Sequence, residues 1–468
     1  MQNEEIFMKK DVKYAKIVKK YEKPMLENLK SFVAINSVYD GVTASETNPF
    51  GEGVSKALKF FEELAKKDGF KVTNYDNKVV EAILGEGKKN ITIMAHADVV
   101  PTGTGWSQDP FKVVEKKGVI YGRGVADDKG PLLSCYYGLL ALKENDLLGK
   151  YRVRFLVGGN EESGSLCMEH YFHTLKKEEP TYGFSPDSNF PVVFAEKGIT
   201  NFEVKKKVNI PGLISIKGGT APNSVIELCE VKFDINDDIV PFLLKNFPDA
   251  EIFTRDDIVN ITFHGKAAHG SVPQLGVNAG MKAIKFLADY TQNKDLLKIV
   301  ECYSDVYGKG CRATGYSHDM GQNSLNVGLI DYVDGEISLI VNFRFVETCS
   351  YDDLKSNIIA ASKPLSVKFF GCSPVLYFKK DSPLIKTLVN AYRAETGDLE
   401  TEPLAIGGGT YAKETANTVA FGLEFPGWDS KMHSVGEQIK IDALNQGMAI
   451  YARAIHSLGQ LIEDEDKI

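Results

Sequence analysis

The sequence lacks the features that mark several protein classes. It contains seven cysteines among 468 residues, but no two of them stand in a Cys-x-x-Cys spacing, which excludes a zinc finger or dithiol redox site of that type. It also has no apolar run long enough to cross a bilayer, and repeats and low-complexity tracts are absent. The longest apolar stretch, around Pro131 to Leu142, predicts a buried helix instead.

An excess of positive charge is lacking as well. The chain has 63 acidic and 55 basic side chains, and its formal net charge is −8 at pH 7. We therefore expect neither nucleic acid nor a membrane surface as a partner. The first twenty residues, MQNEEIFMKKDVKYAKIVKK, mix both signs of charge and have no apolar core, so we expect no secretory signal and a cytoplasmic location.

The pattern of apolar residues predicts an α/β fold with an insertion. Amphipathic helices are expected at Val12–Val33 and Ser55–Lys67, and apolar strands such as NITIMA and RVRFLV then alternate with helices. Such alternation is typical of a mostly parallel sheet covered by helices. Apolar and polar residues alternate with period two from about residue 196. We predict an α/β domain formed by residues 1–195 and 379–468, interrupted by an α+β domain at residues 196–378.

Four segments place acidic or imidazole side chains directly after what look like successive strand ends. They are AHAD with His96 and Asp98, GRGVADDKG with Asp127, GGNEESGS with Glu161 and Glu162, and FSPDSNFP with Asp187. Taken singly, each has a plain structural explanation as a polar strand end, a helix N-cap, solvated glutamates or a turn aspartate. Together they indicate a ligand site, because open α/β sheets bind ligands beyond the carboxyl ends of their strands.

The chemistry of these residues favours a metal. His96 and Asp98 are two apart on an extended chain, so they point to the same side. His96 can bind a metal through one ring nitrogen while Asp98 orients the ring through the other. Glu161 and Glu162 are adjacent, so one can bind metal while the other remains free as a base.

At this point the sequence resembles a known family. The segments AHADVVPTGTGWSQDPF, IYGRGVADDKGP, NEESGS and SPDSNFPVVFAEKG are similar to those of the metallopeptidases that include aminoacylase, carboxypeptidase G and succinyl-diaminopimelate desuccinylase. The segments GTAPNSV, GKAAHGS and GGGTYA resemble the bacterial dipeptidase V branch. The resemblance covers nearly the whole chain. It implies a monomeric dipeptidase that cleaves dipeptides with a free amino end through a metal-bridging water, and it makes the insertion a lid on the catalytic domain.

The resemblance also implies a role for each residue of the site. His96 and Asp187 would bind one metal, and Glu162 and His433, which lies in WDSKMHSVGE, would bind the other. Asp127 would bridge the two metals. Asp98 would support His96 from behind, and Glu161 would be the general base. A bridging carboxylate brings two ions close enough to share one hydroxide. We expect two divalent ions, zinc first, although imidazole and carboxylate ligands also suit manganese or cobalt.

In the lid, the resemblance assigns substrate contacts. His269 would stabilise the oxyanion with help from Asn223, and Arg344 would bind the substrate carboxylate as a planar two-pronged donor. Structural explanations stay open: Arg344 as the exposed neighbour of Phe343 and Phe345, and His269 as a turn residue. The GGGTYA segment, with Gly408, Gly409 and Thr410, is either a backbone nest for a carboxylate or a tight turn.

Two other functions remain open from the sequence. The same scaffold could carry an N-acyl amino acid deacylase or a carboxypeptidase. A non-catalytic relative that binds metal or peptide is the alternative of a different class. The presence of Glu161 argues against that alternative, because a binding protein has no need of a general base.

Overall fold

The computed structural model describes residues 12–236 and 238–467, so the first eleven residues of the segment examined for a secretory signal lie outside the described residues. Contacts divide the chain into two compact units. Unit 1 comprises the residues up to Phe194, Phe378–Leu404 and Thr410 onward, and unit 2 comprises Ala195–Tyr377 and Ala405–Gly409. The predicted boundaries place residues 405–409 in the second part of the α/β domain, residues 379–468. In the structure these residues group with unit 2.

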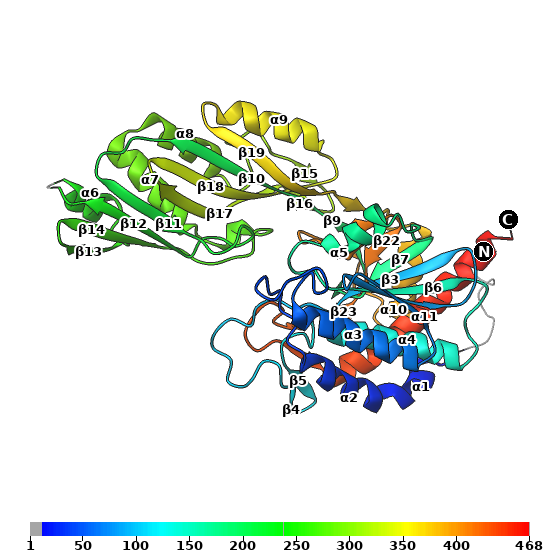
Figure 1. Cartoon of the computed structure of the whole chain (residues 1–468). Helices are drawn as coiled ribbons and strands as arrows, with labels where there is room; N and C mark the ends of the chain where they lie inside the picture. Colours follow the sequence, from blue (N-terminus) through cyan, green and yellow to red (C-terminus); the bar gives the residue numbers. More distant parts are fainter. Residues whose placement is uncertain (1–11, 237, 468) are drawn as a thin grey trace. The chain divides into compact units, whose positions relative to one another are not determined.

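Unit 1 is built on a mixed sheet whose centre is parallel (Figure 1). Its strands lie side by side in the order β1 (Lys71–Tyr75), β2 (Val79–Leu84), β6 (Arg152–Gly158), β3 (Asn90–His96), β7 (Tyr182–Ser185), β22 (Thr418–Ala420) and β9 (Val193–Glu196). The four strands from β6 to β22 are parallel, and antiparallel strands flank them. The predicted α/β class is confirmed, with the parallel pairing confined to the middle of the sheet.

The two faces of this sheet are seen most clearly at β6. Phe155 packs its ring against Phe61 and Tyr136, with centroid distances of 5.5 and 6.2 Å. Its neighbour Arg154 points to the opposite face, where its guanidinium donates to the Tyr171 hydroxyl at 2.6 Å. Since successive side chains on a strand alternate, one face is covered by the helices α3 and α4 and the other by the short helix that carries Tyr171.

The helices of unit 1 follow the predicted pattern with small differences at their ends. They are α1 (Tyr14–Val18), α2 (Glu22–Val33), α3 (Glu52–Lys67), α4 (Lys129–Glu144), α5 (Leu166–Met168), α10 (Pro383–Thr396) and α11 (Ile441–Glu465), with the short turns η1 (Lys19–Tyr21), η2 (Glu169–Thr174) and η4 (Tyr411–Glu414). Helix α5 continues directly into η2, which is a π-helix.

Helix α4 is buried all round, as its apolar sequence predicts. Every residue from Lys129 to Leu142 is buried. It packs so closely on α11 that a Cβ at Gly138 would come within 2.7 Å of the Met448 carbonyl oxygen. Glycine at this position therefore permits the close crossing of the two helices.

Small sheets complete unit 1. One joins β4 (Val114–Lys116), β5 (Val119–Tyr121) and β24 (Gln438–Lys440), and another joins β8 (Ser188–Asn189) to β23 (Leu423–Glu424). The first of these brings the segment after residue 433 beside the segment that precedes α4.

Unit 2 contains an eight-stranded antiparallel sheet. Its order is β13 (Glu251–Arg255), β14 (Ile258–His264), β12 (Leu228–Asp234), β11 (Leu213–Gly218), β17 (Ser324–Val333), β18 (Glu336–Phe345), β10 (Gly198–Lys207) and β19 (Ser366–Ser373). Other elements of the unit are α6 (Ile239–Asn246), η3 (Pro273–Leu275), α7 (Ala279–Thr291), α8 (Lys294–Tyr303), β15 (Tyr316–Ser317), β16 (Gly321–Gln322), α9 (Tyr351–Ser362), β20 (Leu376–Tyr377) and, in the returning segment, the end of β21 (Leu404–Ile406).

Burial along these strands has the period of two that the sequence predicts. In β12, Cys229, Val231 and Phe233 are buried while the residues between them are exposed. The buried face of the sheet packs on α7. There the ring centroid of Phe286 lies 5.7 Å from that of Phe263, which belongs to the neighbouring strand β14. Helix α7 begins at Ala279, where the Asn278 side chain accepts the N–H of Met281 and caps the helix. Among the described residues, no helix has the length and apolarity needed to cross a membrane.

Candidate metal centre

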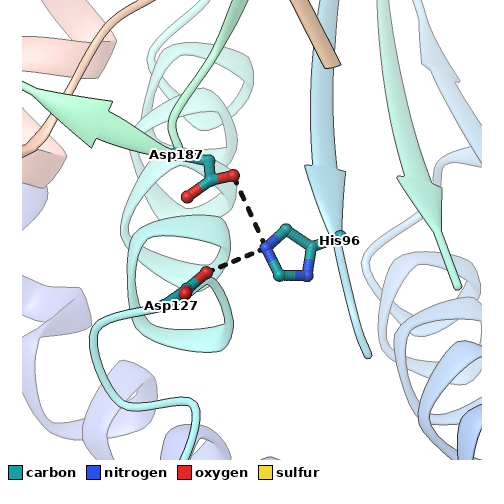
Figure 2. A group of neighbouring side chains, drawn as sticks. All are labelled: His96, Asp127 and Asp187. Carbon is teal, nitrogen blue, oxygen red and sulfur yellow. Dashed lines mark hydrogen bonds and ion pairs between the residues drawn. The ribbon is translucent and has the colours of Figure 1, made fainter. Parts of the chain in front are cut away.

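His96 lies at the last position of β3 with its side chain fully buried. Its Nε2 atom is 3.0 Å from Oδ1 of Asp127 and 3.5 Å from Oδ2 of Asp187. Both contacts are drawn in Figure 2. Asp127 precedes α4, and Asp187 lies in the turn between β7 and β8. The ends of two neighbouring parallel strands and a strand-to-helix loop therefore bring one imidazole and two carboxylates together.

A second group of ligand-type atoms shares Asp127. Nε2 of His433 is 2.9 Å from Oδ2 of Asp127 and 3.2 Å from Oε2 of Glu162. His433 has a positive φ of 59° and a side chain 58% exposed, so it approaches the group from a surface loop. The two groups, His96 with Asp127 and Asp187 and Asp127 with Glu162 and His433, each have ligand atoms within 4.8 Å of one another.

Asp127 stands between the two groups with one oxygen toward each. Burial by itself would raise the pKa of this carboxyl, but its contacts with His433 and His96 hold the pKa well below the usual value. The carboxylate is thus kept ionised, which is the state a bridging ligand requires.

The second ring nitrogen of His96 faces Asp98. Nδ1 lies 3.0 Å from the backbone oxygen of Asp98 and 3.5 Å from its carboxylate. The Asp98 carboxylate instead accepts the backbone N–H groups of Glu161 and Glu162, at 3.1 Å each. Asp98 therefore orients the imidazole mainly through its carbonyl, and its side chain anchors the loop that carries both glutamates.

Asp128 has a different contact from that of an ordinary helix cap. It occupies the N-cap position of α4, but its side chain caps no helical N–H. Its Oδ2 accepts the backbone N–H of His96 at 3.1 Å, and the peptide bond from Asp127 to Asp128 is cis. Asp128 thereby fixes the end of β3 to the start of α4.

Crowding of carboxyl groups changes the acidity of the site. Burial and the nearby Asp187 charge raise the pKa of Glu161 well above its usual value. Burial and the Asp127 charge raise the pKa of Glu162 to about 7, and the same two causes raise the pKa of Asp187. The carboxylates of Glu161, Glu162 and Asp187 lie near other negative charges, and the positive charge of the protein at this point is too small to offset the repulsion.

The residues fit a pair of divalent ions. The buried Oε1 of Glu162 and Oδ1 of Asp128 have no hydrogen-bond partner within the described ranges. A buried carboxylate oxygen without a donor is costly, and a cation removes that cost. Imidazole and carboxylate together are the ligand types of zinc, manganese and cobalt sites.

The candidate substrate residues of the insertion gather within unit 2. Asn223 and His269 are both exposed on adjoining loops, which are joined by a hydrogen bond from Gly270 N–H to the Asn223 carbonyl at 2.7 Å and by a β-bridge between Ser224 and His269. Nδ1 of His269 is 2.7 Å from the hydroxyl of Ser271.

Arg344 is buried rather than exposed. Its side chain is 3% exposed, its Nε donates to Oδ1 of Asn342 at 3.0 Å, and its Nη1 donates to the carbonyl of Gly407. The explanation of Arg344 as a solvent-facing neighbour of two phenylalanines is therefore wrong. Burial lowers the pKa of Arg344 to about 10, and the two acceptors are neutral.

The glycine segment is divided between the two units. Gly407, Gly408 and Gly409 group with unit 2, where a Cβ at Gly407 would come within 2.5 Å of the Ser271 side chain. Thr410 belongs to unit 1 and caps η4 by accepting the N–H of Ala412 at 3.2 Å. Thr410 therefore acts as the cap of a short helix.

Sequence reasoning missed Glu437 and Tyr411. The fully buried Glu437 accepts the backbone N–H of Asp127 at 3.1 Å, and the Tyr411 ring lies edge-on to the His96 ring with a centroid distance of 6.2 Å. Glu437 stands four residues after His433, and that short spacing is the one signal that points to it.

Comparison with known proteins places the chain among peptidases. Residues 92–457 match the model of Peptidase family M20/M25/M40. A protein of Staphylococcus aureus (strain USA300) named a putative dipeptidase is 34% identical over 463 residues, which cover 94% of this chain and 98% of the relative. A protein of the same name from Staphylococcus epidermidis is 34% identical over the same coverage.

Solved structures show the same fold at lower sequence identity. The dipeptidase Dug1p of Saccharomyces cerevisiae is 16% identical with a TM-score of 0.58, and covers 96% of this chain and 98% of its own. A metallo-carboxypeptidase of Sulfolobus solfataricus is 18% identical with a TM-score of 0.58, over 93% of this chain and 99% of its own. Human carnosine dipeptidase 1 is 15% identical with a TM-score of 0.57, over 96% and 99%.

Proposed function

The chain belongs to Peptidase family M20/M25/M40, and on that basis we propose that it is a metal-dependent dipeptidase acting on dipeptides with a free amino end. As a member of the family it is a hydrolase of peptide bonds. The observation that carries the proposal is the pair of ligand groups that share Asp127, with Glu161 beside them. The dipeptidase names of the 34% identical relatives support the choice of substrate length.

The residues that would hold the ions follow from the two groups. His96 and Asp187 would bind one ion, Glu162 and His433 would bind the other, and Asp127 would bind both. Divalent ions held there would act as Lewis acids on the scissile carbonyl and would lower the pKa of a water molecule toward about 7. Zinc is our first choice, with manganese and cobalt as alternatives that the ligand set also suits.

Glu161 would act as the general base. Its backbone is held by Asp98, and its neighbour Glu162 has its Oε2 directed to His433, which leaves the Glu161 carboxyl for proton transfer. A group that accepts a proton from water and donates it to the leaving nitrogen needs a pKa near the working pH, whereas burial and the Asp187 charge raise the pKa of Glu161 well above its usual value in the metal-free protein. Bound cations would lower that pKa toward the working range, since positive charge favours the ionised form.

Three residues of unit 2 would contact the substrate. We assign the C-terminal carboxylate to Arg344, a buried cation whose hydrogen bonds lead to the neutral acceptors Asn342 Oδ1 and Gly407 O. A guanidinium binds a carboxylate with two parallel N–H groups, which fixes the end of a peptide. His269 and Asn223, exposed and adjacent, would stabilise the oxyanion.

The experiment that tests this function is a substrate comparison. Purified protein supplied with zinc, manganese or cobalt would be assayed on a dipeptide, the matched tripeptide, the N-acetylated dipeptide and an N-acyl amino acid. The proposal predicts efficient cleavage of the free dipeptide and weak cleavage of the others. Preference for the N-acyl substrate would establish a deacylase, and binding without turnover would establish a non-catalytic relative.

A further inference from the structure

Glu437 is a fully buried carboxylate that none of the proposed metal or substrate roles uses. It accepts three backbone N–H groups of one loop: Gly124 at 3.0 Å, Ala126 at 2.9 Å and Asp127 at 3.1 Å. Its other oxygen accepts from Nη1 of Arg123 at 2.7 Å. A carboxylate with this many donors is fixed in place, and it fixes the segment 123–127 in turn.

The same glutamate also ends the loop that carries His433. The neck of this loop is closed by a hydrogen bond from Gln438 N–H to the Ser430 carbonyl at 2.8 Å, and Glu437 O accepts the N–H of Gly122 at 3.1 Å. Between these anchors, the residues 431–436 are exposed or half-buried. Glu437 is therefore the first buried residue on the C-terminal side of His433.

Arg123 strengthens this connection from the other side. Its side chain is 1% exposed, and its Nη2 is 3.4 Å from the carbonyls of Pro101 and Ser434. Its guanidinium also lies 5.5 Å from the Trp106 ring centroid. Arg123 therefore contacts both Glu437 and Ser434, the residue that directly follows His433.

We propose that Glu437 is a positioning residue that sets the distance between Asp127 and His433, and so the affinity of the metal site formed by Asp127, Glu162 and His433. The proposal rests on the two-metal function above. His96 and Asp187 stand at the ends of β3 and β7 and have no bond to Glu437, so the other site depends on it only through Asp127.

A purely structural role would predict something different. Removing one partner of a buried Glu–Arg pair leaves an uncompensated buried charge, and this lowers stability wherever the pair lies. The chain offers a matched control in Glu81, a buried carboxylate 3.1 Å from Nε of buried Arg154. Glu81 also bonds to the hydroxyls of Tyr75 and Tyr171, and those partners lie outside both ligand groups.

The test compares full-length wild type, Glu437→Gln, Glu437→Asp and Glu81→Gln. Metal content per chain would be measured after dialysis against zinc buffered by a chelator over a range of free concentrations, alongside melting temperature. Glu437→Gln should bind the first ion nearly normally and the second at least ~10-fold more weakly, the usual scale for groups that orient metal ligands. Its kcat should fall while KM stays near the wild-type value, because Glu437 does not touch substrate.

The control and the second variant decide between the explanations. Glu81→Gln should lower the melting temperature but keep both zinc affinities. Glu437→Asp keeps the charge but shortens its reach, so it should also weaken the second ion, and it decides the matter where Glu437→Gln fails to fold. Wild-type affinity for both ions in the folded Glu437 variants, or equal loss of metal in Glu81→Gln, would overturn the proposal. A wild type that binds fewer than two ions would instead contradict the two-metal function itself.

Discussion

The Asp98 carboxylate holds Glu161 by its backbone, accepting the Glu161 N–H at 3.1 Å with one oxygen while the other oxygen accepts the Glu162 N–H. The side chain that follows His96 by two residues therefore fixes the glutamate loop, and its carbonyl oxygen contacts the ring of His96. One residue links the first candidate metal ligand to the candidate general base.

This link predicts the effect of removing the carboxylate. Asp98→Ala should keep the fold but lower turnover by ~10–100-fold, the range seen for groups that support metal ligands. Asp98→Asn should lose less, because its remaining oxygen can still accept one of the two N–H groups. Steady-state kinetics, with circular dichroism spectra to confirm the fold, would check this prediction. Wild-type turnover in Asp98→Ala would show that the contacts of the Asp98 carboxylate do not contribute to catalysis.

The adjacent glutamates should separate into two roles. Glu161→Gln should reduce kcat at least ~100-fold, as expected for loss of a general base, while retaining both ions. Glu162→Gln should weaken one ion, because Oε2 of Glu162 is a ligand-type atom 3.2 Å from His433. The measurement is kcat together with metal content for each variant. Near-normal turnover in Glu161→Gln would show that Glu161 is not the general base.

Metal uptake should release protons. Contacts with Asp127 and Glu162 raise the pKa of His433 to about 11 in the metal-free protein, so its imidazole carries a proton at pH 7. Burial and Asp127 raise the pKa of Glu162 to about 7, so it is partly protonated there. Both groups must lose protons before they bind metal, and affinity should therefore rise with pH.

Calorimetry can count these protons. Zinc titrations at pH 7 in buffers of different ionisation enthalpy should give heats that change linearly with that enthalpy, with a slope that reports proton release. A slope of zero would mean that zinc binding releases no net protons, and it would contradict the protonated states expected of His433 and Glu162 in the metal-free protein.

Arg344 should recognise the C-terminal carboxylate of the substrate. Its buried guanidinium would have to bind a carboxylate for the dipeptide to be held at both ends. Arg344→Ala should raise KM strongly for a dipeptide and reduce the discrimination against the C-terminally amidated analogue, while metal content stays unchanged. Equal cleavage of acid and amide by the wild type would remove the carboxylate role of Arg344.

The sequence predicts what depends on local pattern. His96 and Asp187 were recognisable because short apolar strands end just before them, and the two-residue alternation of β12 follows directly from its residues. Helix ends required finer signals, such as the Asn278 cap that delays the start of α7.

Contacts between distant parts of the chain could not be predicted. Glu437 and the N–H of Asp127 are separated by 310 residues, and the spacing of Glu437 from His433 does not indicate that Glu437 meets Asp127. The burial of Arg344 likewise depends on Asn342 and on the Gly407 carbonyl, 63 residues further along. The Asp98 carbonyl lies nearer to Nδ1 of His96 than the Asp98 carboxylate does, and the carboxylate also accepts two N–H groups of the glutamate loop; only the folded structure reveals these contacts.

The most direct test of the account is a metal titration of activity. The protein would be stripped of metal, with its content confirmed near zero, and zinc or manganese would be added back stepwise while hydrolysis of a free dipeptide is followed. We predict no turnover in the stripped protein and a maximum at two ions per chain, lost again in Glu161→Gln at the same metal content. Full turnover by the stripped protein, or no hydrolysis of any dipeptide at two ions per chain, would contradict the account.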